Sequence, residues 1–198
     1  MTGTDFFRPE EVEALGFASV GTEVQISRHA LLLAPERISI GARSRIDAFC
    51  ILSGSPDGLI IGRNVHLSAY TSILGQGPTT IGDFCTVSVR CSIFSSNDDY
   101  SGLTLTNPTV PPELRCAETR PVRIMRHAIL GAGCVVLPGV VIGESSAVGA
   151  LSLVKANVPA FAVVAGVPAR IIGQRDSQHV KAAAGYLAAE RGSHVLDG

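Results

Sequence analysis

The sequence predicts an all-β protein folded as a parallel β-helix, and two periodic features carry this prediction. A branched aliphatic residue recurs at every sixth position over long stretches of the chain. Four residues after most of these anchors, the side chain is small or β-branched. Stacked coils of three short strands produce both patterns, whereas a strand of period 2 or a helix of period 3.6 produces neither. The anchors are Val20, Ile26, Leu32, Ile40, Ile46, Leu52, Ile61, Leu67, Ile73, Ile81, Val87, Ile93, Ile124, Leu130, Val136, Ile142, Val148 and Val154.

The segments outside the repeats divide the chain into a capping segment (1–19), the β-helix domain (20–175) and a tail (176–198). A short helix is expected over 9–15, because Pro9 suits a first helical turn, glutamates follow it and Gly16 ends it. The repeats stop over 94–123, an insertion rich in proline and short polar residues that predicts a long functional loop. After Val154, a proline-punctuated segment is expected to leave the coil and pack along it. The alanine-rich tail predicts one helix, followed by a loosely structured end at 194–198.

The composition excludes several classes of protein. The formal net charge is −1, so nothing points to a nucleic acid or an anionic membrane as partner. Neither a signal-peptide pattern nor an apolar stretch long enough to cross a bilayer occurs, and a cytoplasmic protein without membrane insertion is expected. Four of the five cysteines take the small inward position of the repeat, and Cys116 lies in the insertion. Without CxxC or Cys/His zinc spacing, no metal is expected.

Two runs of sequence carry a resemblance to a known family. The run ILGAGCVVLPGVVIGESSAVGALSLVKANVPAFAVVAGVPARII resembles the C-terminal signature of the hexapeptide-repeat acyltransferases. IGRNVHLSAYTSI, followed by FSSNDDYSGLTLTNPTVP, is similar to a branch that acetylates sugars for surface polysaccharides. The resemblance covers about 11–175 and implies a left-handed β-helix, a homotrimer and acetyl-CoA as co-substrate. The implied acceptor is a hydroxyl or amine of a nucleotide- or lipid-linked sugar of a capsule or O-antigen pathway, which attacks the thioester directly.

Acetyl transfer needs a base to take the proton of the acceptor, and imidazole suits neutral pH. Many relatives carry a catalytic histidine in the inserted loop, but this chain has none between Ile93 and Arg126. His66 is the predicted base, because strand alternation turns it outward in the coil just before the one that emits the loop. Asp98 or Asp99 is expected to reach the imidazole and fix its tautomer, while the other aspartate starts a turn.

The other candidate residues divide between the acceptor and the cofactor. Asn97 and Tyr100 are expected to line the sugar pocket, and His127 is the alternative base. His29, His179 and His194 are expected to be solvated. The resemblance implies that the basic residues Lys155 and Arg170 lie near the phosphates and adenine of CoA. It also implies that pantetheine passes small residues that allow close approach and offer a backbone N–H to the oxyanion, namely Gly131, Ala132, Gly133, Gly149 and Ala150.

Each cleft of the implied trimer is expected to take His66 from one subunit and the wall around Ala132 and Ala150 from the next. Two other functions are compatible with a prism of this kind. A γ-type carbonic anhydrase would need three imidazoles on zinc, including a closely spaced pair, and His66 and His127 stand alone. A non-catalytic scaffold subunit would explain the missing loop histidine, but the acidic insertion and the intact cofactor signature argue against it.

Overall fold

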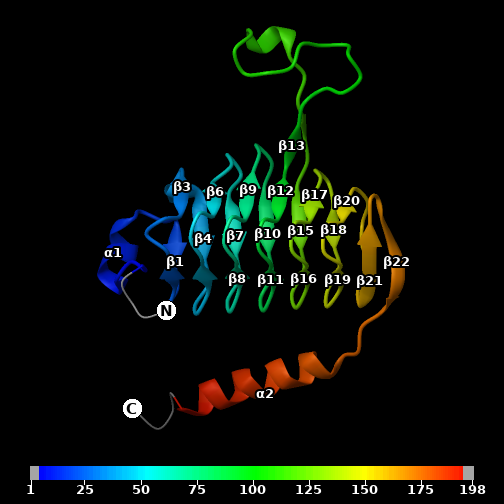
Figure 1. Cartoon of the computed structure of the whole chain (residues 1–198). Coiled ribbons are helices and arrows are strands. Elements are labelled where there is room, and N and C mark those ends of the chain that lie inside the picture. The colour runs from blue at the N-terminus through cyan, green and yellow to red at the C-terminus, as the bar shows by residue number, and fades with distance from the viewer. Residues whose placement is uncertain (1–4, 194–198) are drawn as a thin grey trace.

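The structure is a computed structural model that describes residues 5–193. The chain winds into a prism of stacked coils, each made of three short strands, and the strands of successive coils align into three sheets (Figure 1). Within the coils all strand pairs are parallel and in register, with Ile46 beside Leu67 and Leu67 beside Val87. The predicted left-handed parallel β-helix is confirmed.

The bounds of the strands follow the hexapeptide period, and each sheet collects one strand from every coil. The first sheet contains β1 (Ser19–Val20), β4 (Ile38–Ile40), β7 (Leu59–Ile61), β10 (Thr79–Ile81), β15 (Val122–Ile124) and β18 (Val141–Ile142). The second contains β2 (Gln25–Ile26), β5 (Arg45–Ile46), β8 (His66–Leu67), β11 (Thr86–Val87), β16 (Ile129–Leu130), β19 (Ala147–Val148), β21 (Ala162–Gly166) and β22 (Ala169–Gln174). The third contains β3 (Leu31–Leu33), β6 (Ile51–Ser53), β9 (Ser72–Leu74), β12 (Ser92–Phe94), β17 (Val135–Val136) and β20 (Leu153–Val154).

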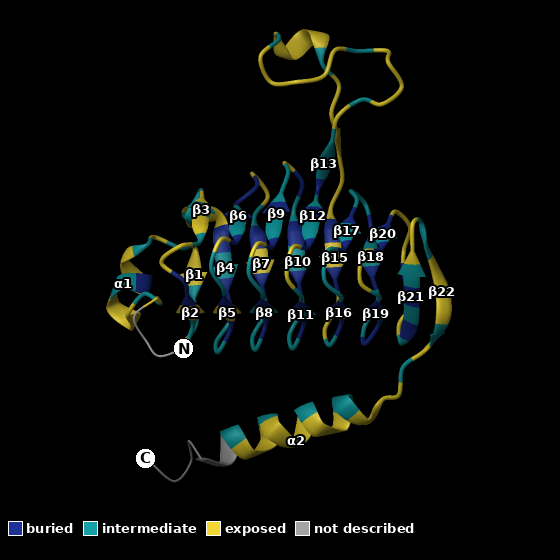
Figure 2. Ribbon diagram, viewed as in Figure 1, coloured by how far each residue is buried: buried dark blue, intermediate teal, exposed yellow. Residues whose placement is uncertain are grey.

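The core is a single column of aliphatic side chains inside the prism (Figure 2). All the predicted anchors are buried except Val20 and Leu32, which are partly exposed because they belong to the first coil and have a neighbouring coil on one side only. The small inward positions are also buried beyond the first coil, and their polar members bond to backbone. The Ser152 hydroxyl, for example, donates to the Gly149 carbonyl at 2.7 Å, and the Cys134 thiol donates to the same oxygen.

Three columns of turns form the corners of the prism. Corner I joins the first sheet to the second through turns such as 62–65, and corner II joins the second to the third through turns such as 68–71. Corner III closes each coil through longer connections, one of which contains the short 3-10 helix η1 (Pro35–Arg37). One residue in most corner I and corner II turns has a left-handed backbone, so the side chains of successive turns stand above one another in columns.

The insertion leaves the prism at corner III as a projecting arm, which we define as residues 96–119 (Figure 1). Its stalk is an antiparallel pair, β13 (Ser96–Asn97) with β14 (Glu118–Thr119), and its outer part contains the 3-10 helix η2 (Pro112–Leu114). Tyr100 and Leu103 of the arm are almost fully exposed, at 87% and 88%. The predicted interruption of the coils therefore corresponds to an arm that touches little of its own chain.

The segment after Val154 was expected to leave the coil, but it continues the prism. It completes one more partial coil, in which Val158 bridges to Ile142 and β21 stacks in parallel on β19. The chain then reverses at Gly166, and β22 pairs antiparallel with β21. The reason is that the inward positions remain apolar, with Val158, Ala162 and Val164 all buried, although the six-residue spacing is lost.

Two helices lie outside the coils. The expected N-terminal helix is α1 (Pro9–Ala14), and Val12 from this helix is buried against the first coil. The tail forms α2 (Gln178–Ser193), which returns along corner I toward the N-terminal coils (Figure 1). Ion pairs join its Glu190 to Arg63 and Arg43. Within 5–193, no helix has the length and apolar character needed to cross a bilayer.

Candidate active site

His66 lies on the outer face of the second sheet, as the strand alternation predicts. It belongs to β8, between Arg45 of β5 and Thr86 of β11, and its side chain is 42% exposed. Its Nε2 lies 2.8 Å from Oδ2 of Asp47, and Arg45 donates through Nε to the other oxygen of the same carboxylate at 2.6 Å. A carboxylate thus fixes the imidazole orientation, as a triad requires, but it is supplied by Asp47.

The carboxylate of Asp47 is suited to hold the His66 imidazole in place as a permanent hydrogen-bond partner. Partial burial would raise the pKa of its carboxyl, but the hydrogen bonds from Arg45 and His66 outweigh burial and leave the pKa below its usual value. Asp47 therefore stays ionised at neutral pH and favours the tautomer of His66 that carries its proton on Nε2. In that tautomer Nδ1 has its lone pair available to accept a proton.

The acidic pair of the arm does not reach His66 within one chain, so the expectation that Asp98 or Asp99 orients this histidine is corrected. The arm leaves at corner III, whereas His66 lies on the opposite, second sheet. Asp99 organises the arm: its carboxylate accepts from the backbone and hydroxyl groups of Ser101 and Thr104 at 2.5–2.9 Å, and these bonds lower its pKa. Asp98 is exposed, and its carboxylate has no hydrogen-bond partner among the described residues.

A pocket on the arm collects the predicted acceptor residues. Asn97, Asp98, Asp99 and Tyr100 line it together with Glu118 and Cys116. Asp98 is thus free to bind a ligand, while Asp99 has the turn role expected for one member of the pair.

The remaining histidines occupy other surfaces. His127 lies at corner I, stacked on Phe84, and burial followed by the nearby charge of His179 lowers its pKa. His179 is not solvated as expected, because α2 places it against the prism, where its Nε2 lies 3.0 Å from the Ser145 hydroxyl. His29 is exposed and stacks on Phe49. His194 lies outside the described residues.

The small residues of the predicted pantetheine path lie in the last two turns of corner II. A Cβ on Gly131 would approach the backbone nitrogen of Ala150 within 2.6 Å, so the next coil takes the space beside this glycine. The N–H groups of Gly131, Gly133 and Gly149 all donate to carbonyl groups of neighbouring coils. Within 5–193, the N–H groups of Ala132 and Ala150 make no such bond, and these two remain available to an oxyanion.

The turn between β8 and β9, which comes directly after His66, belongs to corner II. One chain therefore places His66 and the turns of Ala132 and Ala150 along a single corner. That a cleft combines His66 of one subunit with this wall of the next stays a prediction. The predicted acceptor residues on the arm lie away from corner II, because the arm leaves the prism at corner III.

Lys155 and Arg170 are far apart in sequence, but the structure brings them together. Both line a pocket at the C-terminal end of the prism, with Ala156, Asn157 and Ile171. Lys155 follows β20, whereas Arg170 is brought back by the reversal into β22. Two cations with exposed side chains suit the phosphates of an acyl-CoA.

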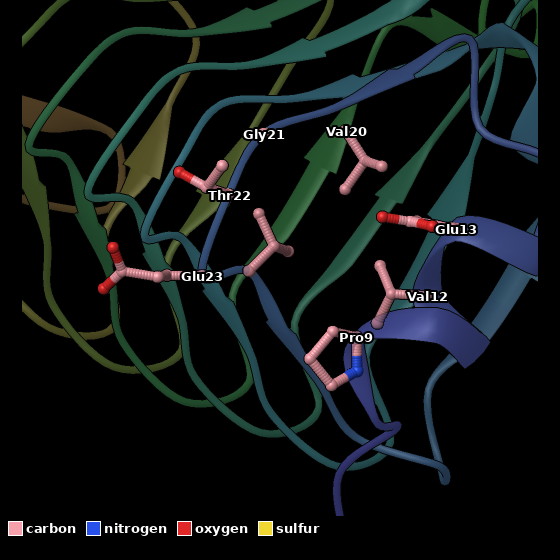
Figure 3. A pocket seen from close by; sticks show the side chains of 8 residues that line it. Pro9, Val12, Glu13, Val20, Gly21, Thr22 and Glu23 are labelled. Carbon is pink, nitrogen blue, oxygen red and sulfur yellow. The ribbon is translucent and has the colours of Figure 1, made fainter. Parts of the chain in front are cut away.

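A second hollow lies at the other end of the prism, between α1 and the first coil (Figure 3). Val12, Val20, Glu13 and Glu23 are among the residues that line it. Glu23 is paired with Arg43, and none of the described residues that line the hollow is a lysine or arginine that could bind a phosphate, so this end does not suit CoA. In the part of the chain that the structure describes, no three His, Cys, Asp or Glu side chains gather as a metal ion would require.

Comparison with known proteins places this fold and site in a family. A dTDP-4-amino-4,6-dideoxy-D-glucose acyltransferase of Escherichia coli is 42% identical over 168 residues, covering 85% of this chain and 88% of that protein. A galactoside O-acetyltransferase of Escherichia coli K12 is 32% identical over 57% of the chain. AntD, an N-acyltransferase from Bacillus cereus solved with dTDP-4-amino-4,6-dideoxyglucose and coenzyme A, superimposes with a TM-score of 0.90 at 38% identity, over 95% of this chain and 100% of that one. No family model matches the chain.

The chain is therefore an acyltransferase that uses acyl-CoA as co-substrate on a left-handed β-helix. It belongs to the sugar acyltransferases of the hexapeptide-repeat family.

The solved variants of AntD replace one serine and one aspartate that lie ten positions apart in that chain. In the present sequence, Ser88 and Asp98 are the single serine and aspartate in that order with this spacing. The sequence alone made Asp98 a candidate site residue but did not single out Ser88 or Asp47. The coil register held the missing signal, because Asp47, Ser68 and Ser88 each follow an anchor of the second sheet and open successive turns of corner II.

Proposed function

We propose that this enzyme transfers an acyl group from acyl-CoA to the amino group of a dTDP-linked 4-amino-4,6-dideoxyhexose in the cytoplasm, on the way to a surface polysaccharide. The observation that carries the proposal is the match to AntD and to the Escherichia coli enzyme over almost the whole chain. The names of these two proteins specify an acyl acceptor of this type or N-acylation, whereas the similarity to the galactoside O-acetyltransferase covers only about half of each protein.

In the proposed reaction, the amine attacks the thioester carbonyl, the tetrahedral intermediate expels CoA as thiolate, and the proton lost by the amine ends on that sulfur. His66 accepts the proton and passes it on, and Asp47 holds its ring. Ser88 and Asp98 hold the attacking nitrogen. The free N–H groups of Ala132 and Ala150 stabilise the oxyanion, and the pocket of Lys155 and Arg170 binds the CoA phosphates.

The experiment is a transfer assay with alternative acceptors. Purified protein is incubated with acetyl-CoA or 3-hydroxybutyryl-CoA and with dTDP-4-amino-4,6-dideoxyglucose, a UDP-linked amino sugar or a galactoside, and CoA release is followed. The dTDP-amino sugar should be the preferred acceptor, and its product should resist hydroxylamine as an amide does. A preference for the galactoside, or an ester product, would refute the proposal.

The two arm aspartates should give different phenotypes. Asp98→Asn removes a charged hydrogen-bond acceptor from the attacking amine, and kcat/KM should fall about 10- to 100-fold with the melting temperature unchanged. Asp99→Asn weakens the bonds to Ser101 and Thr104, so it should increase proteolysis of the arm and raise the KM for the sugar. Steady-state kinetics and limited proteolysis separate the two effects, and equal kinetics for both variants would remove Asp98 from the amine site.

The proposed assembly is a homotrimer in which the arm of one subunit completes the cleft on corner II of the next. Its support is that Ser88 and Asp98 lie at different corners of one chain, and that the arm exposes Tyr100 and Leu103. The impaired variants His66→Ala and Asp98→Asn, refolded together, should therefore recover more activity than either variant alone, because random assortment leaves about a quarter of the clefts intact. Mixed trimers with no recovered activity would show that each site is built within one chain.

A further inference from the structure

The side chains of corner II change character along the prism axis. Phe49, Tyr70 and Arg90 occupy the same left-handed position of three successive turns and stand above one another as a ladder. The Phe49 and Tyr70 rings stack at 5.0 Å between centroids, and the Arg90 guanidinium carbon lies 5.8 Å from the Tyr70 centroid. The next turn has Gly133 at this position. The ladder therefore ends where the predicted pantetheine path begins.

The rings of Phe49 and Tyr70 do not belong to the buried core, so packing of the core does not account for aromatic residues at these positions. Phe49 and Tyr70 are 50% and 52% exposed, and their outer edges face solvent. At the corresponding position of corner I, Phe84 and His127 are covered by α2, which packs Tyr186 and His179 against them. Arg90 is exposed and has no carboxylate partner within 5–193. Corner II thus presents two aromatic rings and an unpaired cation in line with Ser88, which opens the same turn as Arg90.

We propose that this ladder is the subsite for the nucleoside diphosphate part of the acceptor. The planar base lies against the outer edges of Phe49 and Tyr70, an edge-to-face contact that aromatic rings favour. The diphosphate binds the guanidinium of Arg90, which suits phosphate oxygens. The sugar then reaches Ser88, one coil from the free N–H of Ala132. This inference rests on the proposed function, since it assigns the nucleotide end of the same substrate.

The order of the groups along corner II indicates that the ladder binds the nucleotide of the acceptor and not the nucleotide of CoA. CoA phosphates have the cations Lys155 and Arg170 at the C-terminal end, beyond the turns of Ala132 and Ala150. The ladder lies on the N-terminal side of the same turns. Two nucleotides that approach from opposite ends bring amine and thioester together near Ser88.

The test is the affinity for dTDP alone, measured by calorimetry on the intact protein. Tyr70→Ala should weaken dTDP binding about 5- to 100-fold, as expected for losing one aromatic contact to a base. Tyr70→Phe keeps the ring and should stay within about twofold of wild type. Arg90→Ala should weaken dTDP binding and leave thymidine binding unchanged. None of these three variants should alter the affinity for CoA or the melting temperature, because both positions are on the surface.

Unchanged dTDP affinity in both Tyr70→Ala and Arg90→Ala, with the fold intact, would overturn the inference, as would a wild-type protein that binds no dTDP. Failure of the proposed function has a different signature. In that case wild-type protein binds dTDP in a Tyr70-dependent way but transfers no acyl group to the dTDP-amino sugar. Loss of CoA affinity together with dTDP affinity would assign the ladder to the cofactor and would also overturn the inference.

Discussion

Val136→Asp is expected to unfold the prism or leave the protein insoluble. Val136 is fully buried in β17, with Ile93 and Val154 of the adjacent coils above and below it. A carboxylate there has no hydrogen-bond donor or counter-charge in the aliphatic column, and the cost is several kcal/mol, comparable with the whole stability of a domain. Thermal unfolding and the soluble yield measure the effect.

The neighbouring residue supplies the matched control. Val135 belongs to the same strand but points outward and is partly exposed, so the carboxylate of Val135→Asp stays hydrated and should be tolerated far better. Ile142→Val removes one buried methylene and should cost about 0.5–1.5 kcal/mol. Soluble Val136→Asp with an unchanged melting temperature would contradict the assigned register.

His66→Ala is expected to lower kcat about 10²- to 10⁴-fold, the usual span for losing a positioned base. The melting temperature should change little, because the ring is partly exposed and packs on the outside of the prism.

Two further variants test the assignment of the base. His127→Ala, at corner I, should retain most activity, because α2 covers that corner and His127 faces His179. Asp47→Asn should lower kcat about 10-fold, since the imidazole remains but is less well held. Full activity in His66→Ala, or loss of activity in His127→Ala alone, would move the base away from His66.

Much of the fold could be predicted from the sequence because a β-helix is specified locally. Each coil repeats the same requirement, a branched aliphatic residue inside and a small residue four positions later, and burial of Ile142 or Cys134 follows without knowledge of distant residues. The last partial coil shows the limit of this rule. There Val158, Ala162 and Val164 keep the inward pattern, but the spacing changes, and the prediction that the chain leaves the coil was wrong.

The candidate site was less predictable because it depends on how coils align. The pairing of Asp47 with His66 follows from the register of β5 on β8, which single hexapeptides do not reveal. Asp98 and Asp99 were placed by closeness in sequence, but three strands per coil send the arm out at the corner farthest from His66. The meeting of Lys155 with Arg170 required the reversal at Gly166, a tertiary feature that the repeat does not encode.

The reversed direction of β22 has a consequence for how long such a solenoid can grow. A parallel sheet that ended on β21 would offer its open edge as a template for the first coil of another molecule, and stacking could continue into a fibre. With β22 laid antiparallel on that edge, the outermost strand of the second sheet no longer repeats the direction of the coils. The second sheet is therefore self-terminating, which favours discrete particles over end-to-end polymers.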